Sequence, residues 1–466
     1  MIPSFGDSGS DVPVETQVLL LEGVEKTGVH DDDAGTPSSE GTLILAKHKG
    51  TFSHVEDKKV PPHLDWFGWC TWDVFYTRVD PQGIREGLKR FVYMWHALVG
   101  YWGGLHPNHE PLKKYKPKID CGVDGVKVDI QNVVEALGSG YGGRVMLTKK
   151  YQEALEESVL KNFKDNNLIC SMSQNTDFFY SSKKSPVARV SEDYMPHVPA
   201  IQTSHVAAVA FNSFFQGEIA AVDWDMFQSD HVTADFHAAA RALGGCAVYV
   251  SDKPGEHDFK ILKKLVLPDG SILRARYAGR PTRDCLFNDP VTDGKSLLKI
   301  WNMNKFSGVL GVFNCQGAGS WNTKIDVGDF KRDTHQDLPL SALRPVSGHI
   351  SPLDVESLGN VASETWTGHC ANYGENFRFS PIGLLDMYNS GGAVESLKHT
   401  DDSSGCSVLI QARGYGRFGA YSSTKPRACF VDMTEAAFTY SPDDGLLTVT
   451  LPGSAANTSP VLTMQS

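Results

Sequence analysis

Short apolar stretches alternate with helical stretches from Asp65 to about Cys285, and this alternation limits the possible folds more than any other property of the chain. Such alternation is typical of a parallel α/β core, because each helix returns the chain to the start of the next parallel strand. After about residue 286 the helical periodicity fades. Short strands separated by turns, as in SLLKIWNMN and VLGVFNC, then predict an antiparallel β-sandwich of roughly 170 residues.

The α/β part divides into recognisable elements. Strands are predicted at FGWCTW, at FVYMWHALVGYW, at GVDGVKVDI, at NLICSMS and at CAVYVSD. Helices are predicted from Pro81 behind the N-cap Asp80, over 151–163, over 201–215, and from about residue 230 to Leu243. The first sixty residues contain only weak strand-like pieces at 16–21 and 41–47, separated by an acidic loop.

Two joints in the α/β part are too short. The helix from Pro81 runs directly into the strand at Phe91, although αβ loops normally take about 2 to 6 residues. Only 54 residues separate Asp73 from Lys127, whereas three βα units of an eight-stranded barrel need nearly twice that number. We therefore expect that segments are missing from this region.

Composition excludes several classes of protein. The net charge is −11 and no basic block is present, so a nucleic-acid partner is not expected. Nine scattered cysteines without a CxxC pair argue against a disulfide framework and a cysteine-built zinc site. No signal peptide or membrane span is recognisable. We expect a soluble, unsecreted protein of a reducing compartment, namely the cytoplasm, with the plastid as the alternative.

Carboxylates near strand ends are the first candidates for chemistry, because parallel α/β folds build their sites at that edge. Asp129 ends the strand VDGVKVD, and Lys127 points to the same side by the period-two rule. The cluster RVSEDYMP supplies Glu192 and Asp193. A retaining glycosidase needs two carboxyl groups about 5 to 5.5 Å apart, which Asp129 and Asp193 would satisfy. The alternatives are a helix cap for Asp129 and a solvated acidic loop for the second cluster.

Tryptophan is concentrated in the same half of the chain. Six of the nine tryptophans lie there, at positions 66, 69, 72, 95, 102 and 224. Indole stacks well on the apolar face of a pyranose, so this distribution suits a sugar site, although tryptophan at strand ends is also common in cores. Asp73, Asp223 and Asp225 lie beside such strands and have turn or cap roles as their alternative.

Together these motifs resemble one family. WFGWCTWDVFYT, VDGVKVDIQN, GSGYGGRV, RVSEDYMP, VDWDMFQSDH and GGCAVYVSDKPG are similar to the plant raffinose synthase and seed imbibition protein family, which belongs with glycoside hydrolase family 36. The resemblance extends from about residue 48 to 325. VSDKPG and SEDYMP are more similar to its alkaline α-galactosidase branch.

The resemblance implies a (β/α)₈ TIM-type barrel between β-domains. We expect a remnant of an N-terminal β-domain at 1–60, an incomplete barrel at 61–290 and an antiparallel β-sandwich at 291–466. The family's strand ending in an IDDGW-like motif is absent, and so is a second block before VDGVKVD, at the two short joints. Loss of a strand would set the first and third strands side by side or leave unpaired edges.

The resemblance also implies a retaining double displacement on α-galactosides. Asp129 matches the nucleophile and Asp193 the acid/base, with Glu192 as its neighbour. Further pocket positions match Trp72, Asp73, Lys127, Arg189, Glu192, Trp224 and Asp225. The implied substrates are raffinose-type α-galactosides, galactinol and sucrose, with no metal or organic cofactor. Hydrolysis and transfer both stay open, and a non-catalytic remnant that at most binds sugar is the alternative to an enzyme.

Overall fold

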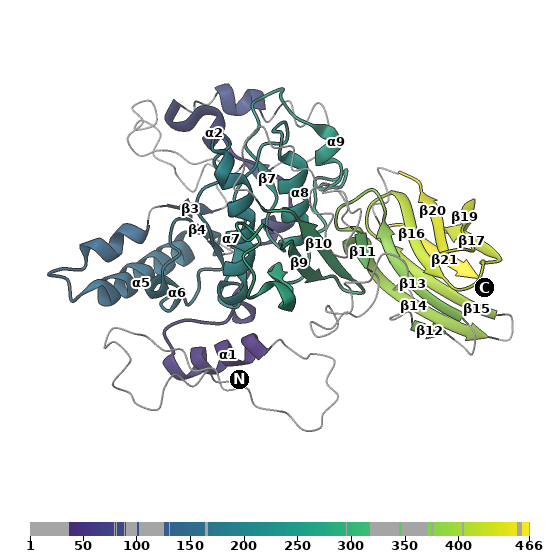
Figure 1. Cartoon of the computed structure of the whole chain (residues 1–466), viewed down its shortest axis with the longest axis horizontal. Coiled ribbons are helices and arrows are strands. Elements are labelled where there is room, and N and C mark those ends of the chain that lie inside the picture. The colour runs from purple at the N-terminus through teal and green to yellow at the C-terminus, as the bar shows by residue number, and fades with distance from the viewer. Residues whose placement is uncertain are drawn as a thin grey trace.

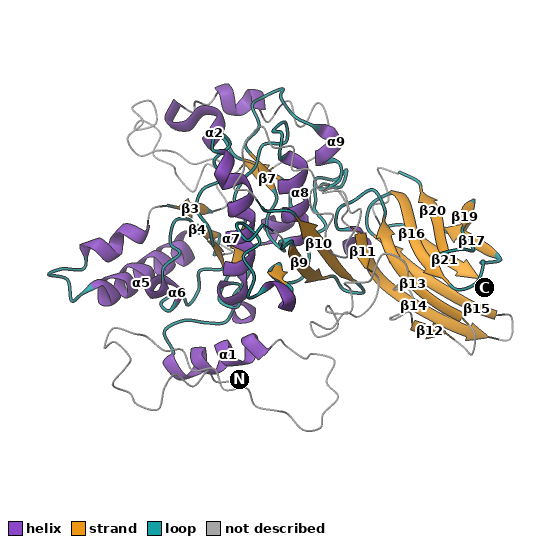
Figure 2. Ribbon diagram, in the orientation of Figure 1, coloured by secondary structure: helices purple, strands orange, loops and turns teal. Residues whose placement is uncertain are grey.

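The computed structural model describes residues 37–78, 80, 82–87, 89, 100–101, 125–129, 131–163, 166–294, 296–316, 344–346, 371–373, 377–402, 405–453 and 459–465. Figure 1 shows a mixed helical and parallel-strand region at one end of the molecule and a strand-only region, β12 to β21, at the other. The same division appears by secondary-structure type in Figure 2. The prediction of an α/β part followed by an antiparallel β part is confirmed.

The described N-terminal segment begins with a helix. Helix α1 spans Pro37–Lys49, so the strand predicted over 41–47 is wrong. Thr42 and Ala46 are both buried, and their spacing of four residues sets them on one helical face. The strand predicted over 16–21 lies outside the described residues. The short 3₁₀ helices η1 (Val55–Asp57) and η2 (Pro62–Asp65) then lead to the first parallel strand.

Among the described residues, seven short parallel strands form the centre of the α/β region. One sheet has the order β2-β1-β7 and the other β3-β4-β5-β6. Their bounds are β1 Gly68–Trp69, β2 Gly100–Tyr101, β3 Val126–Val128, β4 Leu168–Cys170, β5 Val187–Arg189, β6 Ala221–Asp223 and β7 Tyr249–Val250. A parallel bridge between Phe227 and Val250 connects the chain after β6 to β7. All residues of β4 and β5 are buried, as expected for parallel strands covered on both faces.

Helices connect and cover these strands. α5 (Arg144–Asn162) begins earlier than the predicted helix, α7 (Pro199–Gln216) agrees with it, and α8 (Ala234–Leu243) begins later, at the cap Thr233. The shorter helices of the region are α2 (Trp72–Phe75), η3 (Tyr76–Arg78), η5 (Gln131–Leu137), α6 (Thr176–Phe179), α9 (Phe259–Leu262) and η6 (Arg283–Cys285). No described helix has the length and apolar character that a membrane crossing requires.

The first short joint has the structural consequence that was predicted. Residues 82–87 are helical, and Asp80 caps them by accepting hydrogen bonds from the backbone amides of Gln82 and Gly83 at 2.8 and 2.9 Å. β1 pairs directly with β2, so the first strand and the WHA-containing stretch are neighbours. Both joints themselves and most of the strand predicted from Phe91 lie outside the described residues. Among the described strands, no ladder joins β2 to β3, and closure into a barrel is not shown.

The second parallel sheet is strongly curved. Nζ of Lys127 on β3 lies 3.9 Å from Oδ2 of Asp223 at the end of β6. β3 and β6 are three strand spacings apart, about 14 Å in a flat sheet, which exceeds the reach of a lysine side chain. The two strands therefore bend toward each other, and these side chains lie on the concave face.

The antiparallel part contains one small sheet and one sandwich. The small sheet has the order β11-β10-β9-β8, and residues of β9 and β10 belong to the same buried core as the parallel strands. Its bounds are β8 Arg280–Pro281, β9 Leu298–Met303, β10 Gly308–Phe313 and β11 Arg344–Val346. Within the described residues, both facing sheets of the sandwich are built from strands after residue 370. The division into domains at residues 60 and 290 stays a prediction.

The sandwich packs two five-stranded sheets around a second core. Their orders are β12-β13-β16-β20-β19 and β14-β15-β21-β17-β18. The bounds are β12 Ala371–Tyr373, β13 Phe377–Leu384, β14 Val394–Asp402, β15 Gly405–Ala412, β16 Gly416–Ser422, β17 Ala428–Val431, β18 Thr434–Glu435, β19 Phe438–Tyr440, β20 Leu446–Leu451 and β21 Val461–Gln465, with η10 (Ser390–Ala393) before β14. Asn304 and Asn389 hydrogen-bond each other between the two cores.

Candidate active site

A group of charged side chains meets on the concave face at the carboxyl ends of β3, β5 and β6. We call Lys127, Arg189, Asp223, Asp225 and Tyr249 the charged cluster. Lys127 lies 3.6 Å from Asp225 and donates to the Tyr249 hydroxyl at 3.2 Å. That hydroxyl donates to Asp223 at 2.9 Å. Arg189 donates to the other oxygen of Asp225 at 3.2 Å. Two of the predicted pocket residues, Lys127 and Arg189, thus both contact a third, Asp225.

The cations of the charged cluster keep Asp225 ionised. Burial would raise the pKa of this fully buried carboxyl, but Arg189 and Lys127 hold that pKa well below its ordinary value. In return, burial would lower the pKa of Lys127, and Asp225 and Asp223 raise it. The pKa of Arg189 is likewise raised, against burial, by Asp225 and Asp193. Lys127, Arg189 and Asp225 are therefore all charged at neutral pH.

The backbone around Asp225 is fixed as firmly as its side chain. Its φ of 61° is uncommon for a residue other than glycine. Its carboxylate accepts from the backbone amide of Tyr194 at 2.8 Å, and its carbonyl oxygen accepts from Nε of Arg241 at 2.9 Å. Local strain of this kind persists only where the surroundings impose it, and it concentrates at functional sites.

Asp193 connects the charged cluster to solvent. It forms an ion pair with Arg189, and 37% of its side chain is exposed, whereas Arg189 is almost wholly buried. The neighbouring Glu192 is exposed, and its carbonyl oxygen accepts from Ser191 Oγ. Of the two acidic residues of this loop, Asp193 is therefore the one with a described contact to the charged cluster.

The loop that carries Asp193 is held from behind by side chains that the sequence analysis did not select. Gln202 on α7 donates to the carbonyl oxygen of Met195 at 2.8 Å, and its Oε1 lies 3.0 Å from Nε2 of His237. Nδ1 of His237 accepts from Arg241 at 3.0 Å, because a guanidinium can only donate. Burial lowers the pKa of His237 well below its ordinary value, so the ring is neutral and relays one hydrogen bond. The sequence did offer a sign of this role, because Gln202 is a polar residue on the buried face of the helix predicted over 201–215.

Asp73 lies on the β1 side of the site. It is 8% exposed and accepts a hydrogen bond from the Ser251 hydroxyl at 2.8 Å. Burial raises the pKa of Asp73 to about 7, an effect that this hydrogen bond opposes and that the negative charges of Asp225 and Asp193 reinforce. Trp72, the residue before Asp73, is 43% exposed.

Asp129 follows β3 and is exposed. In the sheet Val128 pairs with Cys170, and Cys170 pairs with Ala188. Asp129 comes one residue after Val128, just as Arg189 comes one residue after Ala188. Asp129 is therefore level with Arg189 across the sheet. By the alternation of side chains it shares the face of Lys127. The structure brings both predicted catalytic residues to one edge of one curved sheet, while their roles stay predictions.

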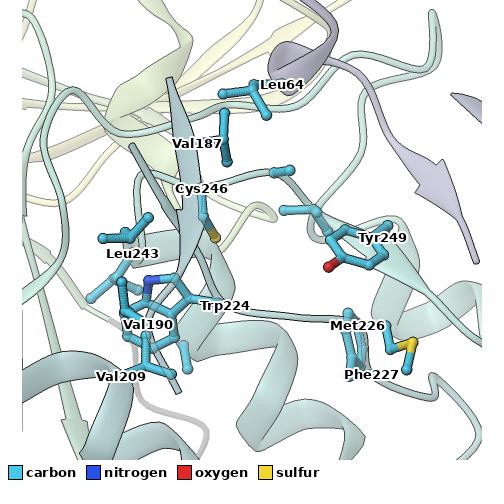
Figure 3. Close-up of a cluster of buried hydrophobic side chains, with 14 of the residues drawn as sticks. Leu64, Val187, Val190, Val209, Trp224, Met226, Phe227, Leu243, Cys246 and Tyr249 are labelled. Atoms are coloured by element: carbon cyan, nitrogen blue, oxygen red, sulfur yellow. The ribbon is translucent and has the colours of Figure 1, made fainter. Parts of the chain in front are cut away.

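Trp224 requires a correction. We expected it to line the pocket, but it is 0% exposed. Figure 3 shows its indole packed among Val190, Val209 and Leu243, within a cluster of buried apolar side chains. Trp224 alternates with Asp223 and Asp225 along the chain, so its side chain points to the opposite face, toward the covering helices. Its motif DWDM therefore contributes carboxylates to the site and an indole to the core.

Two residues of the site were missed or undervalued in the sequence. Tyr249 lies in the apolar stretch CAVYVSD, so the sequence suggested only that its ring packs in the core. In the structure its hydroxyl also belongs to the charged cluster. Asp223 has a turn or cap as its ordinary interpretation, and the structure pairs it with Lys127 instead. Within the described part of the chain, no three histidine, cysteine, aspartate or glutamate side chains are grouped so as to hold a metal ion.

Comparisons with known proteins identify relatives. A family model described as "Raffinose synthase or seed imbibition protein Sip1" matches residues 39–92, 114–377 and 373–451. The chain is 37% identical to a probable galactinol–sucrose galactosyltransferase 1 of Arabidopsis thaliana, over 89% of this chain and 75% of the relative. It is 38% identical to probable galactinol–sucrose galactosyltransferase 6 of the same plant, over 97% and 87%. Stachyose synthase of Pisum sativum is 34% identical over 78% and 51%.

These alignments also bear on the two short joints. The first of them extends over 577 positions, more than the 466 residues of this chain, although it covers only 89% of the chain. An alignment longer than the chain requires gaps, so the relatives carry internal segments that this chain lacks. The family model is likewise interrupted between residues 92 and 114. Internal shortening is therefore confirmed.

Among solved structures, an α-amylase from H. orenii matches with a TM-score of 0.20 and 11% identity, over 75% of this chain and 62% of that one. A likeness this low carries no argument about the fold. The family match covers most of the chain, and the relatives are more than 30% identical over most of their own length. The chain therefore belongs to the raffinose synthase and seed imbibition protein family.

Proposed function

We propose that the chain transfers or hydrolyses α-galactosyl groups of raffinose-type oligosaccharides or galactinol. The observation that carries this proposal is the contact between Arg189 and Asp193: an acid at the site's solvent boundary is attached to a buried network of charges. The names of the relatives supply the substrate class, since they are galactinol–sucrose galactosyltransferases and a stachyose synthase. The proposed substrates are accordingly galactinol, sucrose and α-galactosides.

The proposed chemistry is a double displacement. The Asp129 carboxylate attacks the anomeric carbon, the glycosidic bond breaks, and Asp193 donates its proton to the departing oxygen. A β-galactosyl ester on Asp129 results. Asp193, now ionised, then removes a proton from water or from a sugar hydroxyl, which attacks the anomeric carbon and restores the α configuration. Water gives free galactose, and a sugar hydroxyl gives a transfer product.

The charged cluster supports this chemistry electrostatically. Lys127 and Arg189 are permanent cations on the face that Asp129 shares. Charges fixed before the reaction need no reorganisation when charge moves between the sugar and the two acids. β3 and β5 are separated by one intervening strand, about 10 Å, so side chains that converge on a concave face can approach the separation of about 5 Å that a retaining mechanism uses.

For the architecture, we propose an incomplete (β/α) barrel. The curvature between β3 and β6 and the row of neighbours from β2 through β1 and β7 toward β6 support it. The direct β1–β2 pairing would remove one strand from the ring.

Release of nitrophenol from nitrophenyl α-galactoside tests the activity. We expect release by the wild-type chain and its loss in Asp129→Asn at an unchanged unfolding temperature. Asp443→Asn, an exposed aspartate of the sandwich, is the matched control and should behave as wild type. Full activity of Asp129→Asn would remove Asp129 from the nucleophile role.

Incubation of galactinol with sucrose then separates transfer from hydrolysis. Raffinose formation identifies a transferase, and free galactose alone identifies a hydrolase.

The second candidate function is sugar binding without turnover. It is favoured by the β1–β2 pairing, which moves Asp73 by about one strand spacing, 4.8 Å, relative to a full barrel. Misplacement of about 1 Å already costs about a hundredfold in rate. Calorimetric binding of methyl α-galactoside by a well-folded chain that releases no nitrophenol would select this candidate.

A further inference from the structure

Helix α2 presents its side chains in three directions. Asp73 points inward to the Ser251 hydroxyl. Phe75 packs against the core of the parallel strands, and a Cβ on Gly83 would come within 2.8 Å of its ring. Trp72 and Tyr76 are four residues apart and point outward. The helix is therefore anchored on two sides while it carries two aromatic rings on the third.

The two rings form an exposed pair. The ring centroids of Trp72 and Tyr76 lie 5.6 Å apart with an interplanar angle of 76°. Their exposed fractions are 43% and 44%, whereas Asp73 between them is 8% exposed. An edge-to-face pair covers only one face of one ring, so aromatic surface stays open to solvent directly beside a buried carboxyl. Apolar ring surface next to a polar pocket suits a sugar, which has apolar ring faces and a polar rim.

The backbone indicates that Tyr76 is held in position. Its φ of 47° and ψ of −125° form a combination that glycine tolerates and other residues rarely adopt. Such strain persists when packing imposes it, and it gathers at ligand sites. Burial and then the charge of Asp73 raise the pKa of Tyr76, so the phenol lies near Asp73 and keeps its proton.

We propose that Trp72 and Tyr76 form a stacking subsite for the second sugar ring of a neutral oligosaccharide whose terminal galactose occupies the space beside Asp73. The subsite rests on the proposed function and adds a role for Tyr76. This residue would decide how tightly the chain binds an oligosaccharide relative to a monosaccharide. The two rings and one hydroxyl offer stacking and a hydrogen bond without a charge, which fits a neutral sugar.

Calorimetry in an Asp129→Asn background, where no ligand is consumed, tests the subsite with two probes. Methyl α-galactoside has one sugar ring, and raffinose has two further rings after its galactose. We expect Tyr76→Ala and Trp72→Ala to weaken raffinose binding by about tenfold and methyl α-galactoside binding by less than about twofold, since an aromatic contact contributes about a factor of ten at most. Tyr76→Phe retains the ring and should retain most of the affinity for raffinose.

Three further results separate the outcomes. Tyr415→Ala, which removes an equally exposed tyrosine (40%) from the sandwich, should change neither affinity. Tyr76→Gly relieves the strained φ and should lose raffinose affinity without loss of stability, which rules out a folding defect. An equal effect on both probes, or none, overturns the subsite while the proposed function stands. Absence of methyl α-galactoside binding by the parent protein overturns both.

Discussion

Asp225 and Asp73 are both buried aspartates of the candidate site, yet their pKa values move in opposite directions. Asp225, on the β6 side, touches Arg189, Lys127 and the Tyr194 amide. Asp73, on the β1 side, has a described hydrogen bond from the Ser251 hydroxyl alone. Burial acts on both, so the neighbours decide which carboxyl keeps its proton.

The two sides differ in sequence in the same way. Most of the β6 side comes from residues 187–250, which the family model matches without a break. Near the β1 side, the family model leaves residues 93–113 of this chain, which include β2, unmatched. The β6 side of the site therefore has paired charges, and the β1 side has Asp73, whose pKa is raised to about 7. The variants below test this difference.

Arg189→Met should have the largest effect. It leaves the buried Asp225 carboxylate with Lys127 as its only cation in the charged cluster, and breaking a buried ion pair on one side costs about 3 to 5 kcal/mol. Denaturant unfolding followed by tryptophan fluorescence measures the loss. Arg417→Met is the matched control, because Arg417 pairs with Asp386 on the surface and should cost less than about 1 kcal/mol. Equal losses in the two variants would contradict a buried, ionised Asp225.

Asp73 should make stability fall as pH rises. Its carboxyl ionises near its ordinary value of 3.8 in the unfolded chain and at about 7 in the folded one, so the folded state binds the additional proton between these values. The contribution of protonated Asp73 to the free energy of unfolding is fully present below about pH 4, and it is lost as the pH rises through about 7. From pH 5 to 8 the loss is about 3 kcal/mol.

Asp73→Asn should remove this decline, which thermal unfolding at several pH values would reveal as a flatter curve. Ser251→Ala should steepen it, because the lost hydrogen bond favoured the ionised form. If the wild type and Asp73→Asn have parallel curves, the two sides of the site do not differ as described.

The sequence predicted the two sides unequally well. The structure contains the two strands predicted at NLICSMS and CAVYVSD and the two helices predicted between them. It also contains β5 and β6, which carry Arg189 and Asp223 and which the sequence analysis did not predict. Period-two alternation predicted that Lys127 would lie on the same side as Asp129 and support that carboxylate. The described ion pairs of Lys127 are instead with Asp223 and Asp225, which come from a strand three places away and which only curvature brings near.

The failures have a common cause. The stretch at 41–47 was predicted as a weak strand from local sequence, and Trp224 was assigned to the pocket by the family resemblance. The burial of both depends on distant helices and on the core. The contacts of Gln202, His237 and Tyr249 likewise depend on residues far along the chain. Local pattern indicates which face a side chain occupies, and tertiary packing decides what it meets there.

Gln202→Leu should reveal how firmly the β6 side holds the loop of Asp193. The substitution preserves the approximate shape but leaves the Met195 carbonyl and the Nε2 proton of His237 without their partner, at a cost of about 2 to 3 kcal/mol. We also expect faster amide hydrogen exchange over residues 193–198, including the Tyr194 amide that donates to Asp225. Ser204→Ala, two residues further along α7, removes an exposed hydrogen bond within the helix and should alter neither quantity. Unchanged exchange in Gln202→Leu would show that the charged cluster alone fixes the loop.

Tyr249→Phe should have the smallest effect. It tests whether the cations alone, or the cations together with a neutral hydroxyl, stabilise the carboxylates on the β6 side. The variant removes the hydroxyl that donates to Asp223 at 2.9 Å and accepts from Lys127, while Lys127 keeps both carboxylates as neighbours. A hydrogen bond to a charged group contributes about 1.5 to 3 kcal/mol, and we expect the lower end because the cation stays. Tyr440→Phe is the control: its hydroxyl donates to a neutral carbonyl of Ser422 at 3.2 Å, so its loss should cost about 0.5 to 1 kcal/mol in the same denaturant titration. If Tyr249→Phe costs no more than Tyr440→Phe, Lys127 and Arg189 alone keep the carboxylates ionised, and the difference between the two sides of the site is purely one of cations.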